Sequence, residues 1–171
     1  MNRNISVIKD ADGNSIVVIN DIIFKGRQSI DWDDVKRYLY NYVDDFYRIA
    51  ESGDLIYIGK DFPDEYTGSK YTYKLKGTLA KAKANAAQGI PEMVEVATGK
   101  SYRENNGEKH RNSARYGWYK FNSFFALPVY DNSGGLERYN VFHASLLFRH
   151  GNDNKVHLYD IIDIKKKRVT L

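Results

Sequence analysis

Residues 118–164 read WYKFNSFFALPVYDNSGGLERYNVFHASLLFRHGNDNKVHLYDIIDI, and this stretch decides the fold. Three segments rich in β-branched and aromatic residues, 118–130, 138–150 and 155–164, are separated by DNSGGLE and GNDN. Gly, Asn and Asp are the residues that hairpin connections favour. The pattern predicts an antiparallel meander of three strands. Pro128 is expected at an edge or a bulge, because proline lacks a backbone donor.

The residues before the meander predict a hairpin and a first helix. Two β-branched runs, at 5–8 and 16–19, flank the Asp-Gly turn of DADGN, which is a strong hairpin signal. Asp31 can cap a helix whose apolar residues recur at helical spacing as far as Ile49, and Gly53 follows its end.

The middle of the chain predicts one more strand and two more helices. LIYIG at 55–59 is a short strand, and DFPDEYTGS further on is a loop. The Ala- and Lys-rich run from Tyr71 to Gln88 favours a long helix, and Pro91 begins a shorter one that Gly99 closes. We therefore expect an α+β fold in which an N-terminal hairpin and helices pack on a C-terminal antiparallel β-meander.

Charge is distributed unevenly along the chain. Residues 1–69 hold 8 Lys and Arg against 13 Asp and Glu, whereas residues 70–171 hold 18 against 9. The sequence thus divides into an acidic hairpin and helix segment and a basic helix and sheet region, within one compact unit. The basic region is expected to face a polyanion such as RNA. Alternatively, the two parts neutralise each other within the fold.

Composition also bears on the compartment. The 171 residues include no cysteine, which excludes disulfides and thiolate metal sites and fits a reducing compartment. No apolar run approaches the roughly 20 residues needed to span a bilayer, and the opening MNRNISVIKD lacks the apolar region of a signal peptide. We expect a cytoplasmic protein without membrane contact and without a cofactor.

Strand periodicity separates an expected core face from an open face. In 139–150 the even-numbered residues form the core set, and the open face carries Tyr139, Val141, His143, Ser145, Leu147 and Arg149. In 155–164 the core set is Val156, Leu158, Ile162 and Ile164, and the open face carries His157, Tyr159 and Ile161. Asp160 interrupts this second core set and indicates a bulge or an edge.

Three histidines, at 143, 150 and 157, are spaced seven residues apart. An odd spacing puts His143 and His150 on opposite faces of one strand. A three-histidine zinc site is therefore disfavoured, and we predict no metal site.

A hairpin between 139–150 and 155–164 would place His143, Arg149, His157 and Tyr159 on one exposed surface. Two imidazoles, a cation and a phenol can cleave RNA without a metal. One imidazole takes the 2′-hydroxyl proton, a second acid protonates the leaving 5′-oxygen, and the cation stabilises the charged phosphorane. Alternatively, these are half-buried surface residues with no joint role.

A second basic cluster precedes the meander. Lys109, His110 and Arg111, with Arg115 nearby, form a loop that either binds phosphate or is merely solvated, and His110 is the alternative acid or base. Lys74 and Lys81 lie on one side of the expected long helix, where they either track phosphates or face solvent. Aromatic residues follow that either stack on bases or belong to the core: Tyr116, Trp118, Tyr119, Phe121, Phe124 and Phe125.

Several segments between residues 70 and 167 occur in a familiar order: AKANAAQGIPEMVEVA, KHRNSARYGWYKF, FALPVYDNSG, RYNVFHASLLFRH and HLYDIIDIKKK. This succession resembles domains of phages and bacterial integrative elements that are grouped with the barnase, EndoU, colicin-nuclease and RelE (BECR) nuclease fold. The resemblance implies a helical part followed by a four-stranded antiparallel sheet, and a metal-independent ribonuclease acting through strand-borne His, Arg and Tyr groups. His143, Arg149 and Tyr159 match the type of position used, and His110 matches if its loop folds over the same face.

Two hypotheses follow. In the first, a phage or mobile-element protein binds and cleaves RNA, with His143 and His157 (or His110) for proton transfer, Arg149 for phosphate and Tyr159 for positioning. In the second, a non-catalytic protein of such elements binds or inhibits a host protein complex through its acidic half or its basic sheet. The Tyr-rich helix expected at 32–51 could then serve a partner or a homodimer.

Overall fold

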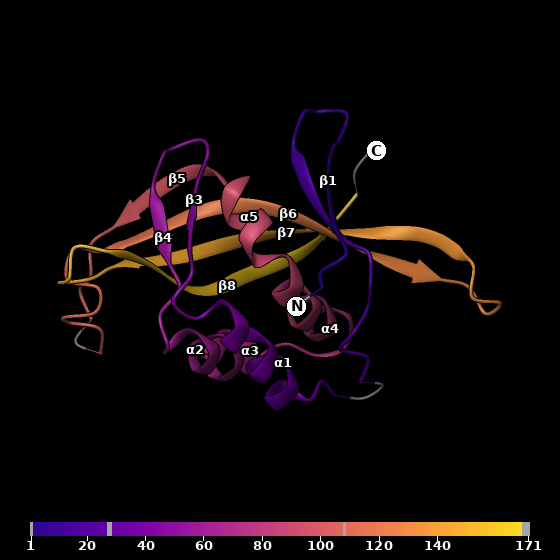
Figure 1. The fold of residues 1–171 in the computed structure, drawn as a ribbon, viewed down its shortest axis with the longest axis horizontal. Helices are drawn as coiled ribbons and strands as arrows, with labels where there is room; N and C mark the ends of the chain where they lie inside the picture. The colour runs from indigo at the N-terminus through magenta and orange to yellow at the C-terminus, as the bar shows by residue number, and fades with distance from the viewer. Residues whose placement is uncertain (1, 27–28, 108, 169–171) are drawn as a thin grey trace.

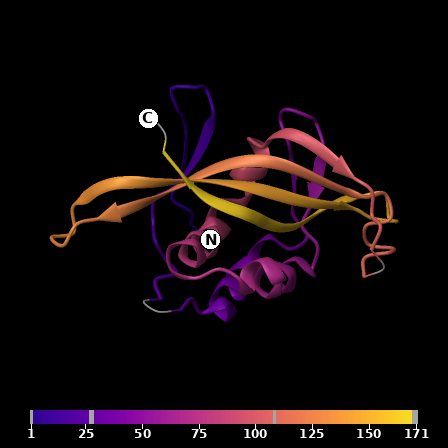
Figure 2. The same cartoon turned by 180° about the vertical axis from the view of Figure 1, so that it is seen from behind.

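The computed structural model describes residues 2–26, 29–107 and 109–168 (Figure 1 and Figure 2). Its helices are α1 (Trp32–Leu39), α2 (Phe62–Gly68), α3 (Lys70–Tyr73), α4 (Gly77–Ala86) and α5 (Ile90–Glu95), with 3-10 turns at Tyr40–Tyr42 and Ala87–Gly89. Its strands are β1 (Ile5–Lys9), β2 (Ser15–Ile19), β3 (Phe46–Arg48), β4 (Leu55–Tyr57), β5 (Thr98–Arg103), β6 (Trp118–Tyr130), β7 (Leu136–His150) and β8 (Val156–Lys167).

All described strands belong to one sheet in the order β1-β2-β6-β7-β8-β4-β3, and β5 pairs with the first part of β6. Neighbouring strands are antiparallel except for β2 beside β6 and β4 beside β8, which are parallel. Helices α1 to α4 gather on one side of the long strands β6, β7 and β8 (Figures 1 and 2). The chain therefore has the predicted α+β class, with an N-terminal hairpin and helices packed on a C-terminal meander.

The strand predictions are largely confirmed. The β1–β2 hairpin, the short β4 and the β6–β7–β8 meander lie where the sequence places them. Pro128 pairs only with β7, because β2 reaches no further along β6 than Ala126, and a register shift follows at Val129. The sequence does not predict β5, which lies in the polar stretch before the meander.

The first helix is shorter than predicted. Asp31 caps α1 by accepting bonds from the backbone N–H groups of Asp33 and Asp34, as expected, but the helix ends at Leu39. Asp44 adopts a positive φ of 74°, and the residues after it pair with β4 as strand β3. The apolar face expected to serve a partner is mostly in the core, because the buried residues include Val35, Leu39, Tyr42 and Ile49.

The long helix expected from Tyr71 to Gln88 is also interrupted. It divides into α3 and α4 at Lys74–Lys76, where Leu75 packs against the core and Gly77 takes a positive φ of 56°. The segment expected to be a loop before it contains α2, which has Pro63 in its first turn. No helix in 2–26, 29–107 and 109–168 combines the length and apolar character needed to cross a membrane.

The faces of β7 agree with the predicted periodicity. Phe142, Ala144, Leu146 and Phe148 lie in the main core, which contains residues from both the acidic and the basic parts of the chain, and Leu147 lies on the opposite face. We call the face of β6–β8 turned away from this main core the open face.

The faces of β8 differ from the prediction because β8 contains two bulges. The register with β7 shifts between Leu147 and Phe148, and again between Ser145 and His143, where β8 contains Asp163 with a φ of +53°. Between the two shifts the alternation is reversed. Ile161 therefore packs in the main core, and Ile162 packs with Leu147 and Tyr159 on the open face.

The first bulge carries a buried charge network that holds the helices on β8. Lys83 of α4 is fully buried and donates 2.6 Å bonds to Asp160 Oδ1 and to Thr72 Oγ1. Asp160 is also fully buried, and its Oδ2 accepts a 2.6 Å bond from the Ser69 hydroxyl. Thr72 donates in turn to the Tyr66 carbonyl. One carboxylate thus joins α2, α3 and α4 to the sheet.

Replacing Lys83 with Met would leave the Asp160 carboxylate buried without its cation. We expect the free energy of unfolding to fall by about 3–5 kcal/mol. Urea unfolding measures this loss. Lys81→Met removes an exposed lysine from the same helix and should change stability by no more than about 0.5 kcal/mol. Similar losses in both variants would contradict the assigned role of the network.

Candidate active site

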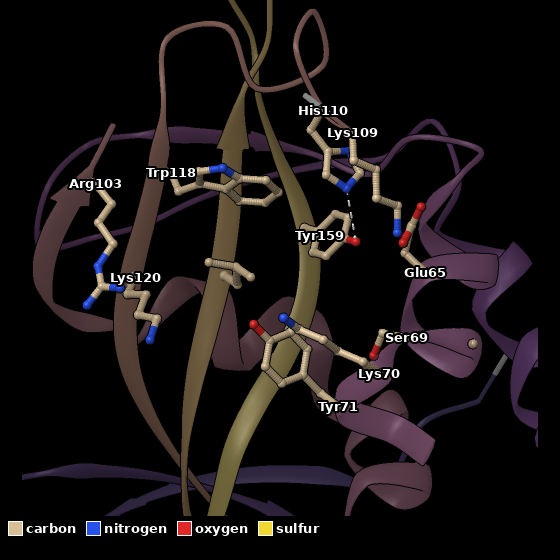
Figure 3. Close-up of a pocket in the computed structure, with 12 residues that line it drawn as sticks. Glu65, Ser69, Lys70, Tyr71, Arg103, Lys109, His110, Trp118, Lys120 and Tyr159 are labelled. Atoms are coloured by element: carbon tan, nitrogen blue, oxygen red, sulfur yellow. Dashed lines mark hydrogen bonds between the residues drawn. The ribbon is translucent and has the colours of Figure 1, made fainter. Parts of the chain in front are cut away.

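A pocket of about 450 Å³ opens on the open face of the sheet (Figure 3). Strands β5 to β8 form its base, the α2–α3 segment lies along the β8 side, and the loop after β5 lies over one end. The chain contributes residues that are far apart in sequence: Glu65, Gly68, Ser69, Lys70, Tyr71, Arg103, Lys109, His110, Trp118, Lys120, Leu147 and Tyr159.

His110 and Tyr159 form the polar centre of the pocket. His110 Nε2 and the Tyr159 hydroxyl are hydrogen bonded at 3.2 Å, and His110 Nδ1 and the Ser113 hydroxyl at 3.1 Å (Figure 3). The Trp118 ring packs edge to face against both, with centroids 5.3 Å from His110 and 5.1 Å from Tyr159. Both nitrogens of the imidazole are therefore oriented by hydroxyl groups.

Burial shifts both of these groups toward their neutral forms. Burial lowers the pKa of His110, and the nearby Lys109 and Arg149 act in the same direction, whereas Glu65 opposes them. Burial, with the neighbouring Glu65 carboxylate, raises the pKa of the Tyr159 hydroxyl. At neutral pH the site thus contains a neutral imidazole and a phenol beside one carboxylate.

Cations surround this centre on two sides. Lys109 lies at the His110 end with Glu65, and Lys120 and Arg103 lie across the strands on the opposite side (Figure 3). Lys70 projects from the start of α3. Glu65 is the only acid among the described lining residues, so the pocket is strongly electropositive.

Arg149 occupies a smaller adjoining pocket of about 50 Å³, which shares Glu65, His110 and Tyr159 with the first. Its guanidinium donates a 2.9 Å bond to the Ser113 carbonyl, the residue that also contacts His110. Arg149 therefore lines a pocket with the same acid and imidazole, next to the main pocket.

The structure divides the predicted four-residue cluster. His157 is the cross-strand partner of Arg149, but its Nε2 bonds Asp153 at 2.8 Å, and it lines neither of these two pockets. His143 lies six residues from Arg149 on β7, about 20 Å at the usual rise per residue. His143 and His157 therefore cannot share one proton-transfer site. His110, the predicted alternative, is the histidine that meets Tyr159.

The predicted phosphate-binding residues are also divided. Lys109 lines the pocket, but Arg111 and Arg115 are exposed and do not. Lys74 is exposed, 6.0 Å from the Tyr71 ring centre, and Lys81 lines a separate depression beside Lys76.

Sequence reasoning did not identify the following charged or aromatic lining residues: Glu65, Lys70, Tyr71, Arg103 and Lys120. Lys120 could have been predicted from the sequence, because strand parity puts this lysine on the same face as Trp118. Glu65 lies in a segment that the sequence analysis predicts to be a loop, although Pro63 is a helix-start signal.

In the described part of the chain, no three His, Asp or Glu residues come close enough together to hold a metal ion.

No known family model matches this chain, and no curated protein sequence or solved structure matches it significantly. The resemblance to BECR-fold domains of phages and mobile elements stays a prediction.

The surroundings of His110 can be tested by NMR. We expect its imidazole to titrate below the ordinary value of about 6.5. Glu65→Gln should lower the pKa of His110 further, because the Glu65 carboxylate favours the imidazolium. Asp12→Asn, in the β1–β2 turn, removes an equal charge and should leave the titration unchanged. A rise in the pKa of His110 in the Glu65 variant would show that the two groups do not interact.

Proposed function

We propose that this protein is a metal-independent ribonuclease that binds and cleaves RNA in the pocket around His110. One observation carries the proposal: a carboxylate, an imidazole and four cationic side chains from separate elements converge on one pocket. Carboxylate and imidazole are the usual acid–base groups, and the cations complement a phosphodiester.

The proposed reaction is an internal transfer. Glu65 accepts the proton of the 2′-hydroxyl as the 2′-oxygen forms a bond to phosphorus. The bond from phosphorus to the 5′-oxygen breaks, and the His110 imidazolium donates a proton to that oxygen. The products are a 2′,3′-cyclic phosphate and a free 5′-hydroxyl. These roles are consistent with the chemistry of the two groups, because a carboxylate can only accept a proton, whereas an imidazolium can donate one.

The bound phosphate would itself prepare His110 for this role. Burial and two neighbouring cations lower the pKa of His110 in the free protein. A phosphodiester brings a negative charge into the pocket, which favours the imidazolium. Lys70, Lys109, Lys120 and Arg103 would stabilise the additional charge of the phosphorane.

Aromatic side chains beside the cations could hold the bases. Trp118 and Tyr71 both line the pocket, and the amine of Lys70 lies 5.2 Å from the Tyr71 ring centre. Stacking on aromatic rings is sequence tolerant, because every base has a π-face.

A second candidate function, a non-catalytic protein that binds a host protein complex, is favoured by the β6–β7 hairpin. This hairpin projects beyond the rest of the sheet (Figure 1). Near its tip, Tyr130 is 51% exposed and Leu136 52% exposed. Loss of partner binding in Tyr130→Ser and Leu136→Ser, with RNA neither bound nor cleaved by the wild type, would favour this function.

Cleavage of a labelled single-stranded RNA in EDTA tests the ribonuclease directly. His110→Gln and Glu65→Gln should each lower the rate by about 10²-fold or more, because each removes one proton-transfer group. His150→Gln is the matched control, because His150 bonds Asn154 outside the pocket. An RNA left intact by the wild type between pH 5 and 8 would refute the proposal.

The pH profile of kcat/KM tests the assigned roles. Because His110 must be protonated in the free enzyme, kcat/KM should fall as pH rises through the lowered pKa of His110, so the optimum lies below pH 6.5. If kcat/KM instead rises to a plateau above this pH, His110 is the base and the assignment is reversed.

A further inference from the structure

A second basic pocket lies on the same sheet, at the other end of β7. Its volume is about 560 Å³. Four of its seven described lining residues are cations, and none is acidic: Arg138, Tyr139, Asn140, Val141, Lys166, Lys167 and Arg168. The arrangement is suited to a polyanion rather than to an apolar ligand.

Strand periodicity connects the two pockets. Leu147 lines the main pocket and Val141 the second, and β7 has no bulge between them. Because they are six residues apart, both lie on the open face, about 20 Å from one another. His143 and Ser145 occupy the face between them, so a ligand in one pocket can continue to the other without crossing an edge.

The surface between the pockets is also basic. Lys165 and Lys167 are the β8 partners of His143 and Val141. Burial lowers the pKa of His143, and Lys167 and Lys165 lower it further while Asp163 opposes them, as expected beside concentrated positive charge. The acids nearby are already engaged, since Asp163 lies 3.6 Å from Lys120 and Glu137 pairs with Arg138 at 2.9 Å.

Aromatic rings accompany these cations. Phe124 lies opposite His143, with ring centres 5.2 Å apart, and Tyr139 lies opposite Pro128. Both are partly exposed and pack on a small apolar cluster of the open face. His143 also shares a 2.9 Å hydrogen bond with the exposed Asn122. Half-exposed rings between lysines are the elements that bind unpaired bases and their backbone.

We propose that the open face binds one extended single strand of RNA, whose reacting phosphate lies in the main pocket and whose further phosphates reach Lys165 and Lys167 beside the second basic pocket. This inference rests on the proposed ribonuclease function and specifies its substrate as a single-stranded RNA longer than the main pocket alone could hold. His143, which the sequence analysis predicts to transfer protons, is instead part of this binding surface.

Binding of 2′-O-methylated oligouridines tests the proposal, because they lack the attacking hydroxyl and are not cleaved. A short probe of about 3 nucleotides can occupy the main pocket only, and a probe of about 12 nucleotides can reach both pockets. The triple variant R138A/K165A/K167A should weaken the longer probe about tenfold or more and leave the short one within about twofold. Removing about three phosphate contacts should also make the binding of the longer probe less sensitive to salt. The slope of the logarithm of its binding constant against the logarithm of the salt concentration should become smaller by about 2.

The matched control, K9A/K25A/K76A, removes the same charge away from the open face and should bind the longer probe within about twofold of the wild type. If the control loses as much affinity for the longer probe as R138A/K165A/K167A does, the loss results from net charge alone, and the inference is overturned. The pocket variant R103A/K120A should weaken both probes.

Three other outcomes separate the inference from the function on which it rests. If R103A/K120A weakens both probes and R138A/K165A/K167A weakens neither, the extended site is wrong and the proposed function stands. If neither variant weakens either probe, the inference and the proposed function both fail. If R138A/K165A/K167A weakens the longer probe and R103A/K120A weakens neither probe, the far pocket binds RNA without the main pocket, and both the shared surface and the proposed function are refuted.

Discussion

The contact between Lys83 and Asp160 is the interaction on which the arrangement of the helices depends. Both side chains are fully buried, so neither charge can be satisfied by water, and each must be held by partners within the protein. Those partners include Ser69 and Thr72, which lie on either side of the start of α3. The same short segment carries Lys70 and Tyr71 into the pocket. The geometry of the site is therefore coupled to an ion pair on the opposite face of β8.

The strands could be predicted because their signals are local. Alternation of apolar residues and Gly-, Asn- and Asp-rich turns specify β6, β7 and β8 without reference to the rest of the chain. The alternation fails in β8 because a bulge adds a residue without altering composition, so Ile161 and Ile162 exchange faces. Asp160 marked the position of this bulge in the sequence, because a carboxylate within an apolar run needs either solvent or a partner. The partner was a lysine 77 positions earlier, which no local pattern identifies.

The candidate site was less predictable, because its residues meet only through tertiary structure. Strand parity correctly put His143 and Arg149 on one face, but the prediction did not use the rise per residue, which places them about 20 Å apart. His110 depended on how its loop folds, and the loop does lie over the open face at Tyr159. Glu65 comes from the acidic part of the chain, whereas the surrounding cations come from the basic part. The charge asymmetry therefore indicated which part of the chain would attract a polyanion. It did not indicate which acidic residue would lie in the same pocket as the cations.

The two parallel strand pairs have a consequence for the order in which the molecule forms. They join Ile16 to Phe124 and Ile56 to Val156, so each links residues at least 100 positions apart. Such contacts have a high entropic cost of loop closure and form slowly, whereas the β6–β7–β8 meander needs only short loops. On the ribosome, β1–β2 and β3–β4 must wait as unattached hairpins until the last strands are synthesised. Their exposed edges in that interval make the nascent chain more vulnerable to misassociation than the finished fold.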